Sequence, residues 1–183
     1  PQEYVLVAKE ALIDNDTETS HYAASVLSHL ASKLPEAVKE DEDNYLRSGK
    51  DGEAGVKYYK SLKAYIDSKI DDNSLTEEYE EKYILLLKEL IAKESEECYY
   101  KDLVNILIKR KRYDEAEKYI AIFKNRYRKL DEPYIAGLKL AYHMKDFNYL
   151  KNELDALRKS DIHIQGENLK LMRYWINEVD YEK

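Results

Sequence analysis

Apolar side chains recur at intervals of three and four residues over nearly the whole chain after residue 50. This spacing is that of one face of an α-helix, whereas a half-buried strand would alternate apolar and polar residues. The clearest stripe consists of Tyr79, Tyr83, Leu86, Leu87, Leu90 and Ile91. The chain has only five glycines and three prolines in 183 residues, too few for the many turns of a β-sandwich. The sequence therefore predicts an all-α fold.

The apolar stripes and the residues that end them predict seven helices in this part of the chain. Ser74 and Pro133, for example, suit the start of a helix, and the basic run 109–112 suits the end of one. The predicted helices span residues 53–70, 75–93, 95–111, 114–128, 132–145, 147–159 and 166–178.

Two helix starts share a pattern at a spacing of 34 residues. Arg112-Tyr113-Asp114-Glu115-Ala116 begins one helix, and Asp146-Phe147-Asn148-Tyr149-Leu150 begins the other. With Tyr100 and Tyr134 at the large aromatic position of the first helix of each pair, residues 95–159 resemble two tetratricopeptide (TPR) units. The resemblance implies antiparallel helix pairs stacked as an α-solenoid, with a binding surface on the first helices. Unrelated antiparallel helices that share this spacing are the alternative.

The amino end has a different character. The segment 12–24, with its acidic turn and its paired alanines, is similar to the turn and second helix of a HEAT-type repeat. We expect three parts: HEAT-like amino-terminal helices over 1–48, a glycine-containing linker over 49–55, and a TPR-like array with a terminal helix over 56–183. The wider stretch 36–55 holds an acidic run and three glycines, which favours a hinge there.

The charge of the chain is unevenly distributed. The net charge is −7, yet residues 109–129 hold nine basic and three acidic side chains, against 13 basic and 24 acidic ones in residues 1–108. One interpretation is helix-end compensation with a solvated face. The other is a docking patch for an acidic protein surface or anionic lipid, whereas the acidic remainder disfavours nucleic acid. The residues predicted to bind a partner are Lys109, Arg110, Lys111, Arg112, Arg126, Arg128, Tyr100 and Tyr134.

Tyrosine is over-represented, with 18 copies against two phenylalanines and one tryptophan. Some of these rings fall on the apolar stripes and fill the space between helices. Others cannot face the same core, and an exposed groove of a helical repeat is a second place where tyrosine is favoured. Both interpretations stay open, and the second is the reason to place Tyr100 and Tyr134 in a binding groove.

Motifs for catalysis, metals and cofactors are lacking in the sequence. Gly49-Lys50-Asp51 has neither the spacing nor the preceding strand of a phosphate-binding loop. His21 and His29 are eight residues apart, whereas paired zinc ligands on a helix are three or four apart. Cys98 is the single cysteine, so a disulfide framework is excluded. We expect a non-enzymatic protein without a cofactor or a metal.

The function expected from these patterns is protein–protein interaction. The layout resembles helical-repeat components of Pel-type exopolysaccharide synthesis machinery, which implies a scaffold in a larger bacterial assembly, on the cytoplasmic side. A peptide-sensing helical-repeat domain of a regulator is the alternative. The start at Pro1 suggests a longer protein, and the sequence has no apolar run of about 20 residues that would span a bilayer.

Overall fold

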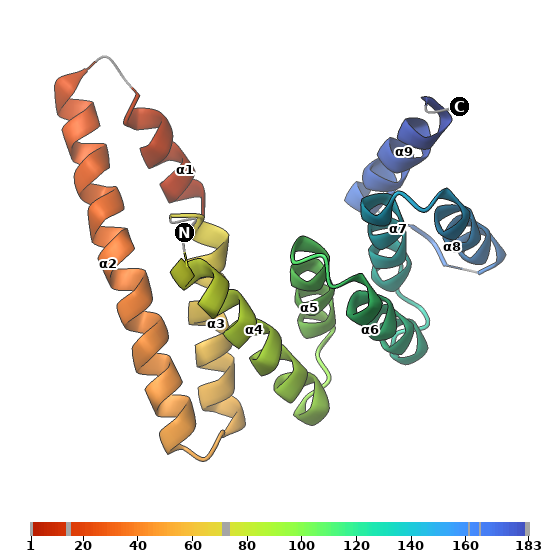
Figure 1. Cartoon of the computed structure of the whole chain (residues 1–183), viewed down its shortest axis with the longest axis horizontal. Coiled ribbons are helices and arrows are strands. Elements are labelled where there is room, and N and C mark those ends of the chain that lie inside the picture. The colour runs from red at the N-terminus through yellow and green to blue at the C-terminus, as the bar shows by residue number, and fades with distance from the viewer. Residues whose placement is uncertain (1, 14–15, 71–73, 161, 165, 182–183) are drawn as a thin grey trace. The chain divides into compact units, whose positions relative to one another are not determined.

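The computed structural model describes the chain except residues 1, 14–15, 71–73, 161, 165 and 182–183. In the described residues the chain forms nine helices and no strand, which confirms the all-α prediction (Figure 1). The helices are α1 (Gln2–Ala11), α2 (Thr17–Arg47), α3 (Gly52–Ser68), α4 (Ser74–Lys93), α5 (Glu97–Lys109), α6 (Tyr113–Arg126), α7 (Glu132–Met144), α8 (Phe147–Lys159) and α9 (Gly166–Tyr181). No helix within these ranges is both long and apolar enough to cross a membrane.

The chain divides into two compact units, residues 1–94 and 95–183. This division differs from the predicted one, in which a linker at 49–55 separates the parts. Gly52 and Gly55 lie inside α3, and α3 packs directly on α2. Gly55 is buried because the ring of Tyr45 and the side chain of Leu90 lie 3.1 and 3.2 Å from where its Cβ would be. Gly55 therefore permits close helix packing, and neither of these two glycines lies in a connection between helices.

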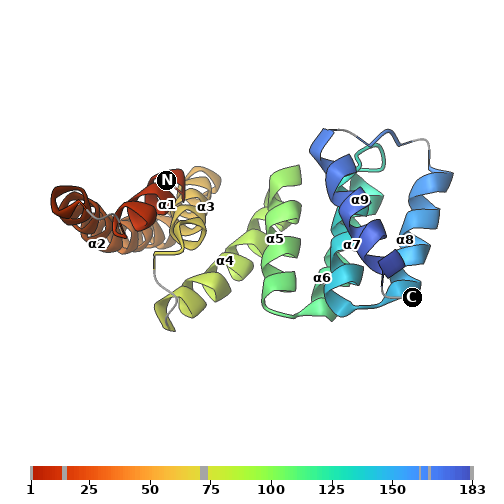
Figure 2. The ribbon, with the colours of Figure 1, turned by 90° about the horizontal axis from the view of Figure 1, so that it is seen from above.

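The first unit contains α1 to α4, with α1 and α2 forming the expected amino-terminal hairpin (Figures 1 and 2). Asp16 caps α2 by accepting from the backbone N–H groups of Glu18 and Thr19. The predicted acidic turn at Asp14 and Asn15 lies outside the described residues. Beyond this cap, α2 continues for 31 residues, with Pro35 inside it.

The predicted hinge over residues 36–55 is wrong for 36–47, which belong to α2. Val38 and Tyr45 are buried two turns apart on one face of that helix. Lys82 of α4 pairs with Glu42 at 2.8 Å, and the Tyr45 hydroxyl donates to Glu89 at 2.8 Å. This part of α2 packs on α3 and forms polar contacts with α4. The acidic run is therefore the polar part of an amphipathic helix.

Tyrosine rings build much of the core of the first unit. Tyr59 stacks on Tyr83 at 5.8 Å between ring centroids, and Tyr65 meets Tyr79 edge-on at 4.7 Å. All four rings are buried. For these residues the core-filling interpretation of the tyrosine surplus is confirmed.

The second unit contains α5 to α9, and each of its predicted helices is present within a few residues of its expected bounds. Helix α7 packs against its chain neighbours α6 and α8 and also against α5, while α9 packs against α7 (Figures 1 and 2). The starts of α6 and α8 are 34 residues apart, as are those of α7 and α9. Helices α5, α7 and α9 therefore form successive neighbours, and we call their shared surface the α5/α7/α9 face.

Candidate functional site

The predicted basic residues lie at opposite ends of α6. Lys109, Arg110, Lys111 and Arg112 surround the turn between α5 and α6, whereas Arg126 and Arg128 lie where α6 ends. A helix of 14 residues is about 20 Å long, so the two groups do not form one patch. The structure brings the basic residues together only within each end.

Some of these cations are already engaged within the chain. Arg112 contacts the carboxylate of Glu115 at 2.6 Å, and Arg128 donates to the side-chain oxygen of Asn125 at 2.6 Å. Lys109, Lys111 and Arg126 have exposed side chains at the surface. Lys111 adopts a positive φ of 57°, which places it at the apex of the tight α5–α6 turn.

The two predicted tyrosines occupy different environments. Tyr100 is only 2% exposed, and its ring stacks on Phe123 with 5.2 Å between centroids. It therefore contributes to the core and is not retained among the candidate surface contacts. Tyr134 is half-buried, with the ammonium group of Lys124 lying 5.2 Å from its ring centroid.

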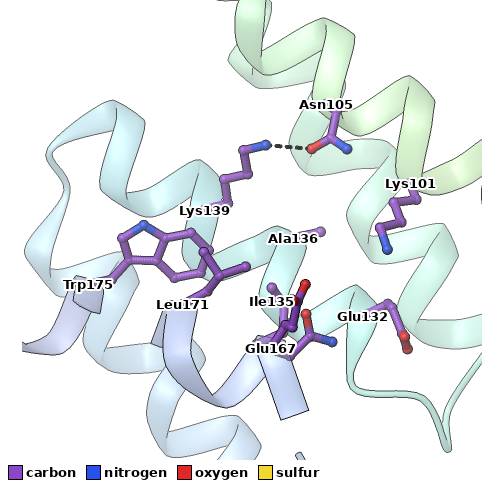
Figure 3. A pocket seen from close by; sticks show the side chains of 10 residues that line it. Lys101, Asn105, Glu132, Ile135, Ala136, Lys139, Glu167, Leu171 and Trp175 are labelled. Atoms are coloured by element: carbon purple, nitrogen blue, oxygen red, sulfur yellow. Dashed lines mark hydrogen bonds between the residues drawn. The ribbon is translucent and has the colours of Figure 1, made fainter. Parts of the chain in front are cut away.

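A cavity of about 260 Å³ opens on the α5/α7/α9 face (Figure 3). Each of the three helices contributes side chains to it, and all of them belong to the second unit. The lining residues are Lys101 and Asn105 of α5, Glu132, Ile135, Ala136 and Lys139 of α7, and Glu167, Asn168, Leu171 and Trp175 of α9. Four of these residues are apolar, and the other six have charged or amide side chains that converge on the cavity.

The apolar wall of the cavity comes from α9 and α7. Trp175 and Leu171 lie beside each other in Figure 3. Trp175 is 7% exposed and belongs to the core cluster that also contains Ile135, Leu138 and Leu150. Leu171, by contrast, is 45% exposed. The wall is thus anchored in the core through Trp175 and accessible at Leu171.

The basic end of the cavity is formed by Lys139 of α7 and its partner Asn105 of α5. Lys139 is half-buried and donates to the Asn105 side-chain oxygen at 2.7 Å, the contact drawn in Figure 3. Burial, and secondarily the charge of Lys101, lower the pKa of Lys139 from its ordinary value. The cost of burying the Lys139 charge is therefore not offset by a neighbouring carboxylate.

The acidic end consists of Glu132 and Glu167, at the first turns of α7 and α9. Burial raises the pKa of Glu132, and the neighbouring Asp131 and Glu97 raise it further. Asp131 also accepts a 3.2 Å hydrogen bond from Asn168, which ties the start of α9 to the start of α7. Among the described residues, Glu132 forms no ion pair with a basic side chain.

A smaller hollow of about 130 Å³ in the first unit provides a contrast. Its charged residues are paired with each other, Lys50 with Glu89 at 2.5 Å and Lys82 with Glu42 at 2.8 Å. The charges of this hollow are therefore balanced within the chain, unlike those of the cavity on the α5/α7/α9 face.

The remaining residues considered from the sequence do not come together in a site. His21 and His29 are exposed and lie eight residues apart on α2. Cys98 is exposed on α5. The described residues contain no group of three or more His, Cys, Asp or Glu side chains that could hold a metal ion. Gly49 and Lys50 lie in the turn between α2 and α3, where two helices rather than a strand and a helix meet.

Comparisons with protein-family models, with curated proteins and with solved structures find no match to this chain. No family is assigned, and the likeness of the layout to Pel-type machinery stays a prediction.

Sequence reasoning missed the cavity, although one signal for it was present. Asn105 and Lys139 are 34 residues apart, so they occupy equivalent positions of the predicted repeat and meet side by side. Polar residues at equivalent positions of the first helices would have indicated a shared polar surface. The contribution of α9 had no such signal, because its packing depends on Trp175 and on the Asn168–Asp131 contact.

Proposed function

We propose that the chain is a non-enzymatic, TPR-like helical-repeat module that binds peptide ligands on its α5/α7/α9 face. The observation that carries this proposal is the cavity on that face, whose half-buried Lys139 has no carboxylate partner among the described residues. A preformed pocket that combines an apolar wall with converging polar groups orients a ligand at little cost in conformational entropy. The 34-residue helix spacing supports the TPR-like part of the proposal.

In this proposal the ligand is first a segment of a partner protein, and the module acts as a scaffold. The exposed cations at the two ends of α6 would raise the rate of encounter with an acidic partner, because long-range attraction acts before contact. The second candidate is a peptide sensor. It is favoured by the small volume of the cavity and by the opposite charges of its two ends.

Selection from a displayed library of random peptides tests the binding face. Selected peptides should bind the chain about tenfold more weakly once Leu171→Glu places a charge on the apolar wall. Ile122→Glu is the matched control, because Ile122 is similarly exposed at 48% but lies on α6 and does not line the cavity. Equal binding to both variants would show that peptides bind elsewhere.

A further inference from the structure

The two ends of the cavity on the α5/α7/α9 face carry unlike charges that are not neutralised by each other. At the basic end, Lys139 donates only to the neutral amide of Asn105 among the described residues, and Lys101 is a second cation close by. A ligand carboxylate would accept from these groups and remove the repulsion between the two ammonium groups.

At the acidic end of the cavity, the complementary ligand group is a cation. Glu132 and Glu167 line the cavity there, and Asp131 lies directly beside Glu132. A ligand ammonium group would pair with Glu132 and Glu167, because a cation within about 4–6 Å favours the charged form of a carboxyl group. One end therefore requires an anion and the other a cation.

The distance between the ends limits the length of the ligand. Glu132 and Lys139 are seven residues apart on one face of α7, which is about 10 Å along the helix axis. An extended peptide spans about 3.3–3.6 Å per residue, so two or three residues cover this distance. The cavity volume of about 260 Å³ is below the range of drug-sized pockets, in agreement with so short a ligand.

The apolar wall adds a requirement for the ligand's side chains. Leu171 and Trp175 line the cavity from α9, and Ile135 lines it from α7 (Figure 3). An internal segment of a protein would need both a basic and an acidic side chain at this spacing, whereas a short free peptide carries both charges on its own termini.

We propose that the cavity binds a free peptide of about two or three residues with both termini unblocked. Its carboxylate lies at the basic end, its ammonium group at the acidic end, and an apolar side chain against Leu171 and Trp175. This inference rests on the binding face proposed above and selects its second candidate, the peptide sensor.

The fluorescence of Trp175 reports binding directly, because it is the single tryptophan of the chain and lines the cavity. The probes are tripeptides Ala-X-Ala, in which X is Val, Leu, Met or Phe. Each is titrated into the full chain in four forms: free, acetylated at the amino terminus, amidated at the carboxyl terminus, and blocked at both ends. The free form should bind best, and each single block should weaken binding about tenfold or more.

Two variants test which end of the cavity binds which terminus of the peptide. In Lys139→Met, amidation of the peptide should weaken binding less than it does in the natural chain, whereas the effect of acetylation should be unchanged. In Glu132→Gln the pattern should reverse. Lys151→Met and Glu117→Gln are matched controls, since both residues are exposed on α8 and α6 and do not line the cavity. Circular dichroism checks that each variant folds, and Glu132→Gln alone tests the inference if Lys139→Met does not.

The possible outcomes separate this inference from the proposed function. Equal binding of all four peptide forms overturns recognition of the termini but leaves the binding face intact. Lack of binding by any tripeptide, with selected longer peptides still sensitive to Leu171→Glu, also overturns the inference and keeps the scaffold. Failure of both kinds of peptide would overturn the proposed function itself.

Discussion

Lys124 of α6 and Glu153 of α8 form an ion pair directly over Gly137 of α7, so one salt bridge joins two helices across a third. Both side chains are largely buried, with 22% and 10% of their surfaces exposed. A Cβ atom at residue 137 would lie 2.8 Å from Glu153 Cδ and 3.3 Å from Lys124 Nζ. The space that the ion pair occupies therefore exists because residue 137 has no side chain.

Gly137→Ala should lower the free energy of unfolding by about 1–3 kcal/mol, because the added methyl group displaces the buried pair. This loss should appear although alanine favours a helix interior over glycine by about 1 kcal/mol. Urea unfolding measures the change. Gly52→Ala is the control, since its Cβ would meet only the exposed side chain of Glu94, which can move away. Equal effects of the two substitutions would contradict the assignment.

Removing one member of the pair should be costly in its own right. Glu153→Ala leaves Lys124 without its carboxylate in a largely buried position, a change of a kind that costs about 3–5 kcal/mol where burial is complete. In the Glu153→Ala background, Gly137→Ala should cost less than it does in the natural chain. Additive losses in this double-mutant cycle would show that residue 137 and the pair are independent.

Lys139→Met should leave stability at neutral pH unchanged or raise it. The substitution removes a half-buried cation whose pKa is lowered by burial and by Lys101, which means that its charge opposes folding. The lost hydrogen bond to Asn105 costs about 1 kcal/mol in the other direction. Thermal and urea unfolding provide the measurement, with Lys139→Arg as the charge-retaining control. A loss above about 2 kcal/mol would identify Lys139 as a structural residue instead.

Stability should fall as the pH rises above about 10, the pKa of tyrosine in an unfolded chain. Burial raises the pKa values of Tyr45, Tyr58 and Tyr149, and Glu89, Glu42 and Glu153 respectively raise them further. Above that pH the unfolded chain releases phenol protons that the folded chain retains, so the unfolded state gains stability. Urea unfolding at several pH values measures the slope.

Tyr58→Phe should make this alkaline slope shallower, since one retained proton is removed. Tyr22→Phe is the control, because the Tyr22 side chain is 75% exposed. A slope that is the same in both variants would exclude Tyr58 as a source of the alkaline instability.

The two basic ends of α6 should act independently in steering an acidic partner. Lys111→Glu and Arg128→Glu lie at opposite ends of a helix about 20 Å long, which exceeds the Debye length of about 8 Å at physiological salt. Each should slow association with a selected acidic peptide and reduce its salt dependence, and the double variant should show the sum of the two effects. Stopped-flow association rates at several salt concentrations provide the comparison, and unchanged rates would remove the basic residues from the mechanism.

Local patterns accounted for the helices of the second unit, because their apolar stripes and end residues act over a few residues each. The same reasoning failed at residues 36–47, where an acidic run belongs to a helix that is fixed by distant contacts with Glu89 and Lys82. It also misplaced Tyr100, since an apolar stripe does not distinguish a core position from a groove position. The cavity required the packing of α9 on α7, which depends on single contacts such as Asn168 to Asp131 rather than on periodicity.

The placement of α9 has a consequence for the order in which the protein is made. Translation produces α5, α6, α7 and α8 first, and these four helices already contact one another in sequence. The wall formed by Leu171 and Trp175 leaves the ribosome only afterwards. A nascent chain can therefore pack its early helices before it has anywhere to hold a ligand, so the capacity to bind arrives in a single late step.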